Sequence, residues 1–247
     1  MENSITQIAY GLLFLVTWVG AVSCTVSTPS FSTATAGQEM AYMAKPLSTD
    51  TTKSATYISG AVGLGSMYDG DDRNTSGEIS LHRSHAFKYG NLAYGAHGFL
   101  GTYKVTKIDD FTGRKTFHGY GFRGSANINL PFAYSDWRVI GVEGAITCES
   151  GTYTSFKKEA AVNGQLIDLH PNKNYTVLGL RSEYIREIPE LENMRLGLSV
   201  GYFWILEERN RMIFLAPYME FYKACMSMVV CANNNAGSIV FRLSYRL

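Results

Sequence analysis

The sequence predicts an all-β fold, namely an antiparallel up-and-down transmembrane β-barrel of about 8–10 strands that follows an N-terminal signal segment and a flexible tether. Three observations predict this fold. Polar and apolar residues alternate along strand-length segments, and long connections alternate with short ones. The chain is also rich in tyrosine and glycine but poor in charged residues.

The alternation gives each segment one apolar face and one polar face, because successive side chains of a β-strand point to opposite sides. Arginines lie on the polar face in each of the clearest cases. A polar face with arginines does not suit the packed core of a sandwich, but it suits the inside of a membrane barrel. The three clearest segments are residues 120–132, 194–206 and 237–247.

Composition limits the possible classes of protein. Lys plus Arg number 22 and Asp plus Glu number 21, so there is no electrostatic reason to expect nucleic acid as a partner. Aromatic residues make up 13% of the chain and charged residues 17%, which suits a barrel with a polar interior and an apolar exterior. Since no proline-rich or charge-rich stretch divides the chain after residue 55, one large domain is expected there.

The N-terminus is expected to be a signal peptide over residues 1–23. An apolar run from Ile5 to Ala21 ends in Ala21-Val22-Ser23-Cys24, where small residues suit cleavage. This tetrad resembles the lipobox of bacterial lipoproteins, and the resemblance implies lipid attachment at Cys24. An uncleaved transmembrane helix is the alternative, because the run is just long enough to span a bilayer.

Residues 24–53 are expected to form a lipid-anchored or flexible tether, since Ser, Thr and Ala dominate and too little apolar surface is available to fold alone. The barrel is expected to occupy residues 54–247. Its candidate strands number nine, whereas bacterial single-chain barrels have an even number. A hidden strand at residues 39–47 or 226–232 would give ten, and an element split in error would give eight. The candidates are residues 54–68, 77–88, 92–105, 117–132, 136–148, 174–186, 193–206, 211–223 and 237–247.

The connections alternate in length until residue 206, where a tight turn replaces the expected long loop. Outer-membrane barrels have long loops outside the cell and short turns in the periplasm, so the long connections are assigned to the cell exterior. The long connections are residues 69–76, 106–116 and 149–173, and the short ones are residues 89–91, 132–136 and 187–192.

The ending Phe241-Arg242-Leu243-Ser244-Tyr245-Arg246-Leu247 resembles the terminal strand of bacterial outer-membrane barrel proteins. Together with the other segments, the resemblance to small outer-membrane β-barrel proteins covers residues 54–247. It implies a location in the bacterial outer membrane, with outer-membrane lipid and the barrel insertion machinery as partners. An extracellular or envelope protein is a further expected partner, and no cofactor is expected.

Charged residues on the polar face predict an ion-pair network that fills the lumen, because an unpaired ion in a low-dielectric interior costs about several kcal/mol. A narrow, charge-lined pore is the alternative, although a barrel of so few strands leaves little room inside. The predicted members of the network are Arg123, Glu143, Arg181, Glu183, Arg195, Glu220 and Arg242.

The apolar face is expected to contact lipid, with aromatic rings near the strand ends at headgroup depth. A soluble periplasmic lipid-binding barrel is the alternative, in which the apolar face would point inward and the arginines outward. The aromatic residues concerned are Tyr120, Phe132, Tyr134, Trp137, Tyr175, Tyr184, Tyr202, Trp204, Phe221 and Tyr245.

Chemistry at cysteine and histidine is expected to be limited. Cys225 and Cys231 flank a short segment and could form a disulfide after export. No metal site is expected, because the histidines are scattered and none lies at ligand spacing from the cysteines.

One pattern raises the question of catalysis. Glu78, His82 and Ser84 share a strand face, and carboxylate, imidazole and hydroxyl groups can form a nucleophilic triad. The His-x-Ser pair loosely resembles that of outer-membrane lipid A deacylases, but in that family the pair lies late in the chain and is followed by Asn. A lipid A-modifying hydrolase is therefore a minor alternative. The main expectation is a non-enzymatic barrel, with no catalytic residues, that has a structural or surface-interaction role through its extracellular loops.

Overall fold

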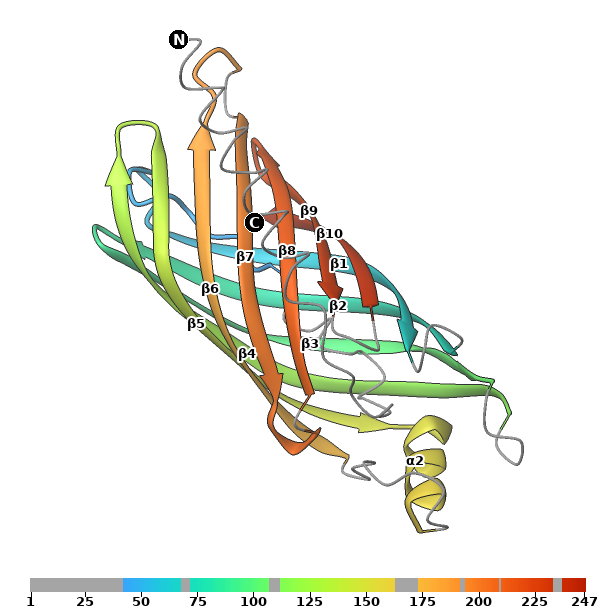
Figure 1. Cartoon of the computed structure of the whole chain (residues 1–247). Helices are drawn as coiled ribbons and strands as arrows, with labels where there is room; N and C mark the ends of the chain where they lie inside the picture. Colours follow the sequence, from blue (N-terminus) through green and yellow to red (C-terminus); the bar gives the residue numbers. More distant parts are fainter. Residues whose placement is uncertain are drawn as a thin grey trace.

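The computed structural model describes residues 42–67, 72–106, 112–162, 173–191, 194–208, 210–232 and 237–247. The predicted signal peptide and Cys24 lie outside these residues. Within them, ten antiparallel strands form one closed barrel (Figure 1), in which each strand pairs with the next in sequence and the last pairs with the first. The predicted fold class is therefore confirmed, with ten as the number of strands.

The strands are long, and several extend into stretches that were expected to be loops. Their bounds are β1 Ser54–Met67, β2 Asp72–Phe87, β3 Gly90–Val105, β4 Gly113–Phe132, β5 Ser135–Ser150, β6 Asn174–Glu187, β7 Met194–Ile205, β8 Asn210–Phe221, β9 Ala224–Ala232 and β10 Gly237–Arg246. The strand missing from the sequence-based count is β9, which matches the hidden strand at residues 226–232. The other possibility is wrong for its described part, since residues 42–47 form no strand.

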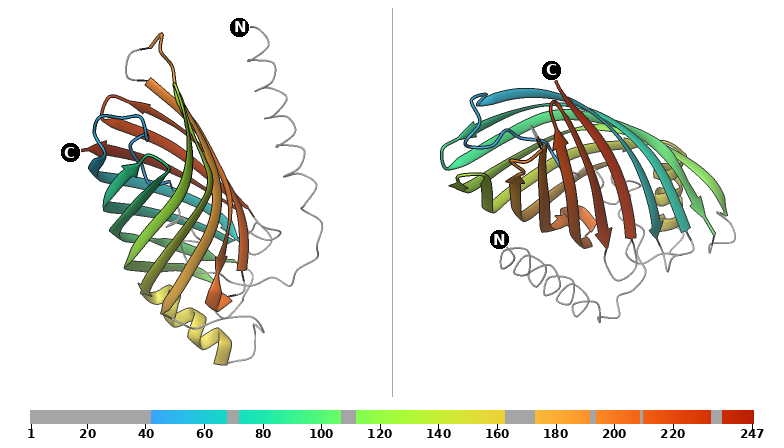
Figure 2. Two further views of the ribbon diagram at one scale, coloured as in Figure 1. Left: turned by 90° about the vertical axis from the view of Figure 1, so that its left-hand side faces the viewer. Right: turned by 90° about the horizontal axis from the view of Figure 1, so that it is seen from above.

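Two helical elements lie at the end of the barrel that was assigned to the cell exterior. The α-helix α2, Thr152–Val162, follows β5, and the short 3-10 helix Leu206–Glu208 connects β7 to β8. Figure 2 shows α2, in yellow, at the barrel end away from the C-terminus. Among the described residues, no helix is both long enough and apolar enough to cross a membrane.

The barrel wall has its apolar side chains outside and its ionic side chains inside. Phe122 is 70% exposed and Ile146 is 66% exposed, whereas Arg123, next to Phe122 in sequence, is only 5% exposed. Most of the aromatic residues predicted on the outer face are there, but Tyr175 is buried and lies on the inner face of β6. This orientation excludes the soluble lipid-binding barrel, which would be inverted.

The β5 strand contains a β-bulge that reverses its inside-outside pattern. Ile128 of β4 pairs with Ile140, but the next residue, Asn129, pairs with Arg138, so Val139 has no partner on β4. An extra residue of this kind shifts every later side chain to the opposite face. As a result, the inward-facing residues of β5 have even numbers before the bulge and odd numbers after it.

Residues 42–48 differ from the flexible tether that the sequence suggested. They lie inside the barrel, and Tyr42, Ala44, Lys45 and Leu47 are each at most 2% exposed. The physical reason is that the segment does not fold alone but fills space inside the barrel, where the strand side chains provide the contacts that its own sequence lacks. Without the barrel around them, the same residues would have no core to pack against.

Candidate functional site

The lumen is the candidate functional site, because the charged residues singled out by the sequence converge there. It contains three zones along the barrel. Residues 42–48 and their ionic partners fill the end with the short turns, a second ion-pair cluster lies further along, and apolar side chains fill the end that carries α2.

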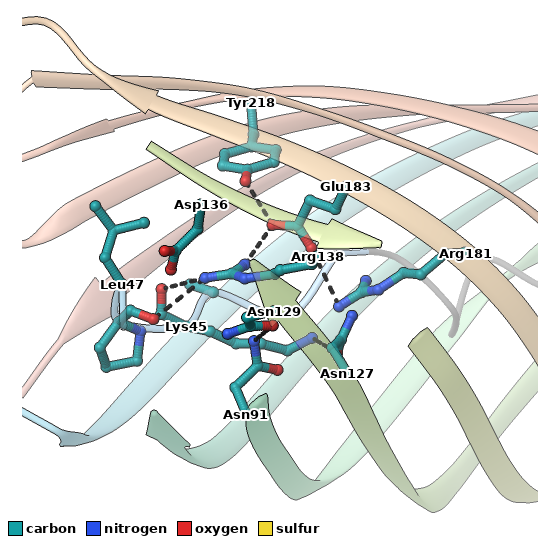
Figure 3. A network of polar contacts seen from close by, with 12 residues as sticks. Lys45, Leu47, Asn91, Asn127, Asn129, Asp136, Arg138, Arg181, Glu183 and Tyr218 are labelled. Atoms are coloured by element: carbon teal, nitrogen blue, oxygen red, sulfur yellow. Dashed lines mark hydrogen bonds and ion pairs between the residues drawn. The ribbon is translucent and has the colours of Figure 1, made fainter. Parts of the chain in front are cut away.

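Arg138 is the centre of the first zone (Figure 3). Its guanidinium forms an ion pair with Glu183 and also donates hydrogen bonds to the backbone carbonyls of Lys45 and Pro46, at 3.3 and 3.2 Å. The hydroxyl of Tyr218 donates a hydrogen bond to the same carboxylate of Glu183. One buried arginine thus joins the barrel wall to residues 42–48, which we call the inserted segment.

Further contacts hold the inserted segment on both sides. Asp136 accepts a hydrogen bond from the backbone N–H of Ser48 at 2.7 Å, and the Nζ of Lys45 lies 3.0 Å from Oδ1 of Asn127. The ring of Tyr42 stacks on that of Tyr218, with centroids 4.1 Å apart. The segment is therefore bound by hydrogen bonds, several of them to charged side chains, and by an aromatic stack rather than by apolar packing alone.

Lys45 is buried beside two guanidinium groups, of Arg181 and Arg138, and two carboxylates, of Glu183 and Glu143. Burial lowers the pKa of its ammonium well below the ordinary lysine value, and the nearby guanidinium of Arg181 lowers it further. Glu183 and Glu143 act in the opposite direction by attracting the charge.

Arg181 connects the inserted segment to the rest of the predicted network. It lies 2.5 Å from Glu143 and 3.5 Å from Glu183, so it bridges two carboxylates on neighbouring strands. Arg195 pairs with Asp50 and with Glu220, the latter at 3.5 Å. These predicted residues all point into the lumen, as the alternation required.

The second cluster joins three strands around one carboxylate. Glu78 lies 3.3 Å from Arg123 and 2.9 Å from Arg242, and both arginines donate hydrogen bonds to Ser80, at 2.7 and 3.2 Å. Two cations on one anion leave a positive charge in the middle of the lumen.

The third zone is apolar. Tyr103 stacks on Tyr153 of α2 with centroids 4.3 Å apart, and Phe156, from the same helix, is also buried. Lys157 forms a buried ion pair with Glu149 at 3.1 Å, which fixes α2 to β5. The helix therefore packs its aromatic face against the inner side of the wall near β4 and β5. The other members of this apolar cluster include Phe99, Val105, Phe117, Val177, Phe203, Ile205, Met212, Phe214 and Val229.

Inward-facing glycines make room for the aromatic rings of this zone. A Cβ on Gly101 would lie 2.4 Å from Cζ of Phe117, and a Cβ on Gly119 would lie 2.4 Å from Cζ of Phe99. These separations are shorter than any tolerated carbon-carbon contact, so the rings occupy the space that side chains would take. The lumen is narrow here because it is packed, as expected for so few strands.

Two residues that matter most at this site were not expected from the sequence. Arg138, like Asp136, is an even-numbered inward position, whereas the inward residues later in the strand, such as Glu143, are odd, and the bulge at Val139 explains the difference. Lys45 lies in a segment with no strand periodicity. Only a search for isolated charges near the barrel ends could have found it.

The predicted disulfide between Cys225 and Cys231 is wrong. Both residues lie on β9, six positions apart, and both point into the lumen. Residues of an extended strand advance by about 3.3 Å each, so the two sulfur atoms are about 20 Å apart. A disulfide requires the Cα atoms to lie within about 7 Å.

The three residues considered for catalysis do not form a triad. Glu78 is engaged by two arginines, His82 contacts the backbone carbonyl of Ala44 at 3.0 Å, and Ser84 lies 3.5 Å from the carbonyl of Ala55. A nucleophilic mechanism needs the base within hydrogen-bond reach of the nucleophile. In the part of the chain that the structure describes, no three potential metal ligands come together either.

Comparison with known proteins supports the architecture. No family model and no curated protein matches the chain. Among solved structures, the chain is similar to the β domain of the Bordetella autotransporter Brka, with 8% identity, a TM-score of 0.50, and coverage of 79% of this chain and 100% of that one.

Two other solved structures are similar over comparable lengths. The outer membrane protein OprG from Pseudomonas aeruginosa has 9% identity, a TM-score of 0.41, and coverage of 82% of this chain and 99% of that one. Neisserial surface protein A has 13% identity, a TM-score of 0.37, and coverage of 79% and 98%.

The closed barrel with an apolar exterior and enclosed ions defines the class of protein. It is an outer-membrane β-barrel, located in the bacterial outer membrane. At such low identity, the similarity concerns the fold.

Proposed function

We propose that this protein is a closed, non-enzymatic barrel of the outer membrane that has a structural or surface-interaction role. The observation that carries this proposal is the double obstruction of the lumen. Residues 42–48 fill one end through Arg138 and Asp136, and the apolar cluster under α2 fills the other. A protein built in this way offers its surface, and in particular its outer loops and α2, rather than a passage.

A narrow channel for small solutes is the alternative that the sequence left open. It is less favoured, because an open pathway would require both obstructions to be removed. The inserted segment is held by hydrogen bonds to Arg138, Asp136 and Asn127, and the aromatic rings beyond it fill the space beside the inward-facing glycines. Lipid A hydrolysis is disfavoured by the separate engagements of Glu78, His82 and Ser84.

Conductance across planar lipid bilayers tests the proposal. The refolded full chain is expected to give no steady conductance steps in KCl solution, because residues 42–48 occupy one end of the lumen and the apolar cluster occupies the other. Faster gel migration of the unheated protein from the same vesicles serves as the control for insertion, since folded barrels resist detergent until they are heated. Regular, ohmic steps from inserted protein would overturn the proposal in favour of a channel.

A further inference from the structure

We propose that the outer wall formed by β1 to β4 binds one phosphorylated lipid of the outer leaflet. The phosphate would lie on a row of basic side chains, and the acyl chains would lie in an apolar groove floored by glycines. This site lies on the membrane-facing side of the wall. Most residues that line it face outward, and Glu78, Phe99 and Arg242, whose side chains face the lumen, lie between them in the lining.

The basic row crosses three neighbouring strands. Arg73 of β2 pairs directly with Lys104 of β3, and Lys104 pairs with Arg114 of β4. All three side chains are exposed on the outer face, at the barrel end that carries α2. They therefore form one continuous cationic surface at the edge of the apolar band.

Three like charges in adjacent cross-strand positions are unfavourable unless an anion offsets them. None of the ion pairs formed by the described residues involves Arg73, Lys104 or Arg114. A phosphate group is a suitable partner, because guanidinium and ammonium groups bind it with charge-assisted hydrogen bonds. The row thus predicts an anionic ligand.

A row of hydroxyl groups lies next to the basic row, on the side nearer the middle of the membrane. Thr75 pairs with Thr102, and Thr102 pairs with Thr116, on the same three strands. Hydroxyl groups at this depth suit the ester, amide or sugar groups of a lipid, which carry hydrogen-bond acceptors but no full charge.

An apolar groove of about 1180 Å³ continues below the hydroxyl row and extends around the wall toward β8 and β9. Its floor on β1, β2 and β3 includes Gly60, Gly77 and Gly98. A Cβ on Gly60 or Gly77 would meet nothing within 4 Å, and one on Gly98 would meet only a backbone oxygen at 3.7 Å. The outward-facing apolar residues along the groove include Val62, Ile79, Leu100, Met226, Met228, Phe241 and Leu243.

These three outward glycines differ from the inward ones. Gly101 and Gly119 are required by the aromatic rings beside them, whereas Gly60, Gly77 and Gly98 face open space. Glycine inside a strand costs stability, and it often marks a position that a ligand approaches closely. Methionine side chains elsewhere in the groove adapt readily to flexible chains. The groove therefore suits hydrocarbon chains.

The spacing of the two features fits one lipid molecule. Arg73 and Gly77 are four residues apart on β2, as are Lys104 and Leu100 on β3, which corresponds to about 13 Å along an extended strand. Charged, hydroxyl and apolar surfaces thus follow one another in the order phosphate, linkage and acyl chain. A protein or nucleic-acid ligand would not occupy the groove, because the groove faces the hydrocarbon of the membrane.

Binding of lipid A to the full chain in phosphatidylcholine nanodiscs tests this proposal. Fluorescent diphosphoryl lipid A is expected to bind the unaltered chain, and the triple variant Arg73→Gln, Lys104→Gln, Arg114→Gln is expected to bind at least about ten-fold more weakly. The matched control replaces three exposed cations toward the opposite end of the barrel, Arg83→Gln, Arg186→Gln and Lys223→Gln, and should change affinity by less than about two-fold.

A second set of variants tests the groove. Gly60→Val, Gly77→Val and Gly98→Val together should weaken the binding of lipid A but leave binding of its deacylated, phosphorylated headgroup unchanged. Equal binding by the basic-row variant and its control would overturn the proposal. Complete displacement of lipid A by equimolar inorganic phosphate would overturn it as well, because it would indicate an adventitious ion site only.

Discussion

At the scale of single residues, the buried pair of Arg138 and Glu183 dominates the lumen (Figure 3). Both side chains are fully buried, so their charges depend on each other and on the polar groups around them. Removing one partner from such a pair leaves an uncompensated charge and costs about 3–5 kcal/mol, whereas replacing both with apolar groups often costs little. The pair is thus a sensitive point of the fold.

Arg138→Met is therefore expected to lower the free energy of unfolding by about 3–5 kcal/mol. The double variant Arg138→Met, Glu183→Met should recover more than half of that loss. Urea unfolding in lipid vesicles, followed by tryptophan fluorescence, gives both values. Arg186→Met, an exposed arginine on β6, is the control and should have an effect within about 0.5 kcal/mol. Additive losses in the double variant would contradict this account.

The sequence was informative about residues wherever strand parity was regular. Arg123, Arg181, Glu183 and Arg242 could be assigned to the lumen because their strands alternate without interruption on that stretch. Arg138 could not, because a single extra backbone residue reverses parity and leaves no mark in the composition of β5. Pairings between strands also escaped prediction, since they depend on register.

At the scale of elements, α2 has one face buried against the barrel and one face exposed at the outer end. Tyr153, Phe156 and Lys157 are buried against the barrel, while Ser155 and Lys158 are exposed. The helix has little amphipathic character by composition alone, and it is held by aromatic stacking and by the ion pair to Glu149. Its exposed face is available at the cell surface if the long-loop end points outward.

Cysteine labelling tests that orientation. In a chain with Cys148→Ser, a Ser155→Cys variant should react with a membrane-impermeant maleimide on intact cells. The matched Lys223→Cys variant, in the exposed turn between β8 and β9, should react only after the outer membrane is permeabilised. The reverse pattern would mean that α2 faces the periplasm, and it would end the proposed surface role.

Elements were predictable where the lumen is polar and less so where it is apolar. The inward residues of β9 are Cys225, Ser227, Val229 and Cys231, so an apolar residue on one face is often followed by another on the opposite face. Without contrast between faces, the strand could not be separated from a loop. The inserted segment was missed for a different reason, because its order comes from contacts with the wall rather than from its own sequence.

At the scale of the whole molecule, the apolar exterior fits the barrel to a bilayer. The outer face of β4 has Arg114, Thr116 and His118 near one end and Phe132 at the other, with apolar and small residues between Tyr120 and Leu130. A cation near the midplane costs about 2–4 kcal/mol, and one near the interface costs about 0–1 kcal/mol. Depth in the membrane should therefore determine the effect of added charge.

Phe122→Arg is expected to destabilise the barrel in lipid vesicles by about 2–4 kcal/mol, because this residue lies near the middle of β4. Phe132→Arg, which makes the same replacement at the end of the strand, should cost about 0–1 kcal/mol. Reversible unfolding in urea measures both. Similar effects at the two positions would show that this wall does not contact hydrocarbon.

The two obstructions of the lumen differ in polarity, so water would enter the space that each one fills to a different extent. If a periplasmic ligand displaced residues 42–48, the ionic half of the interior would hydrate, but Phe99, Phe117 and Phe214 beyond it would still repel water. The barrel would then be a blind vestibule that opens inward only. The apolar side chains of the outer half would thus be the barrier to ions. Residues 42–48 could leave and re-enter the inner half without a leak across the membrane.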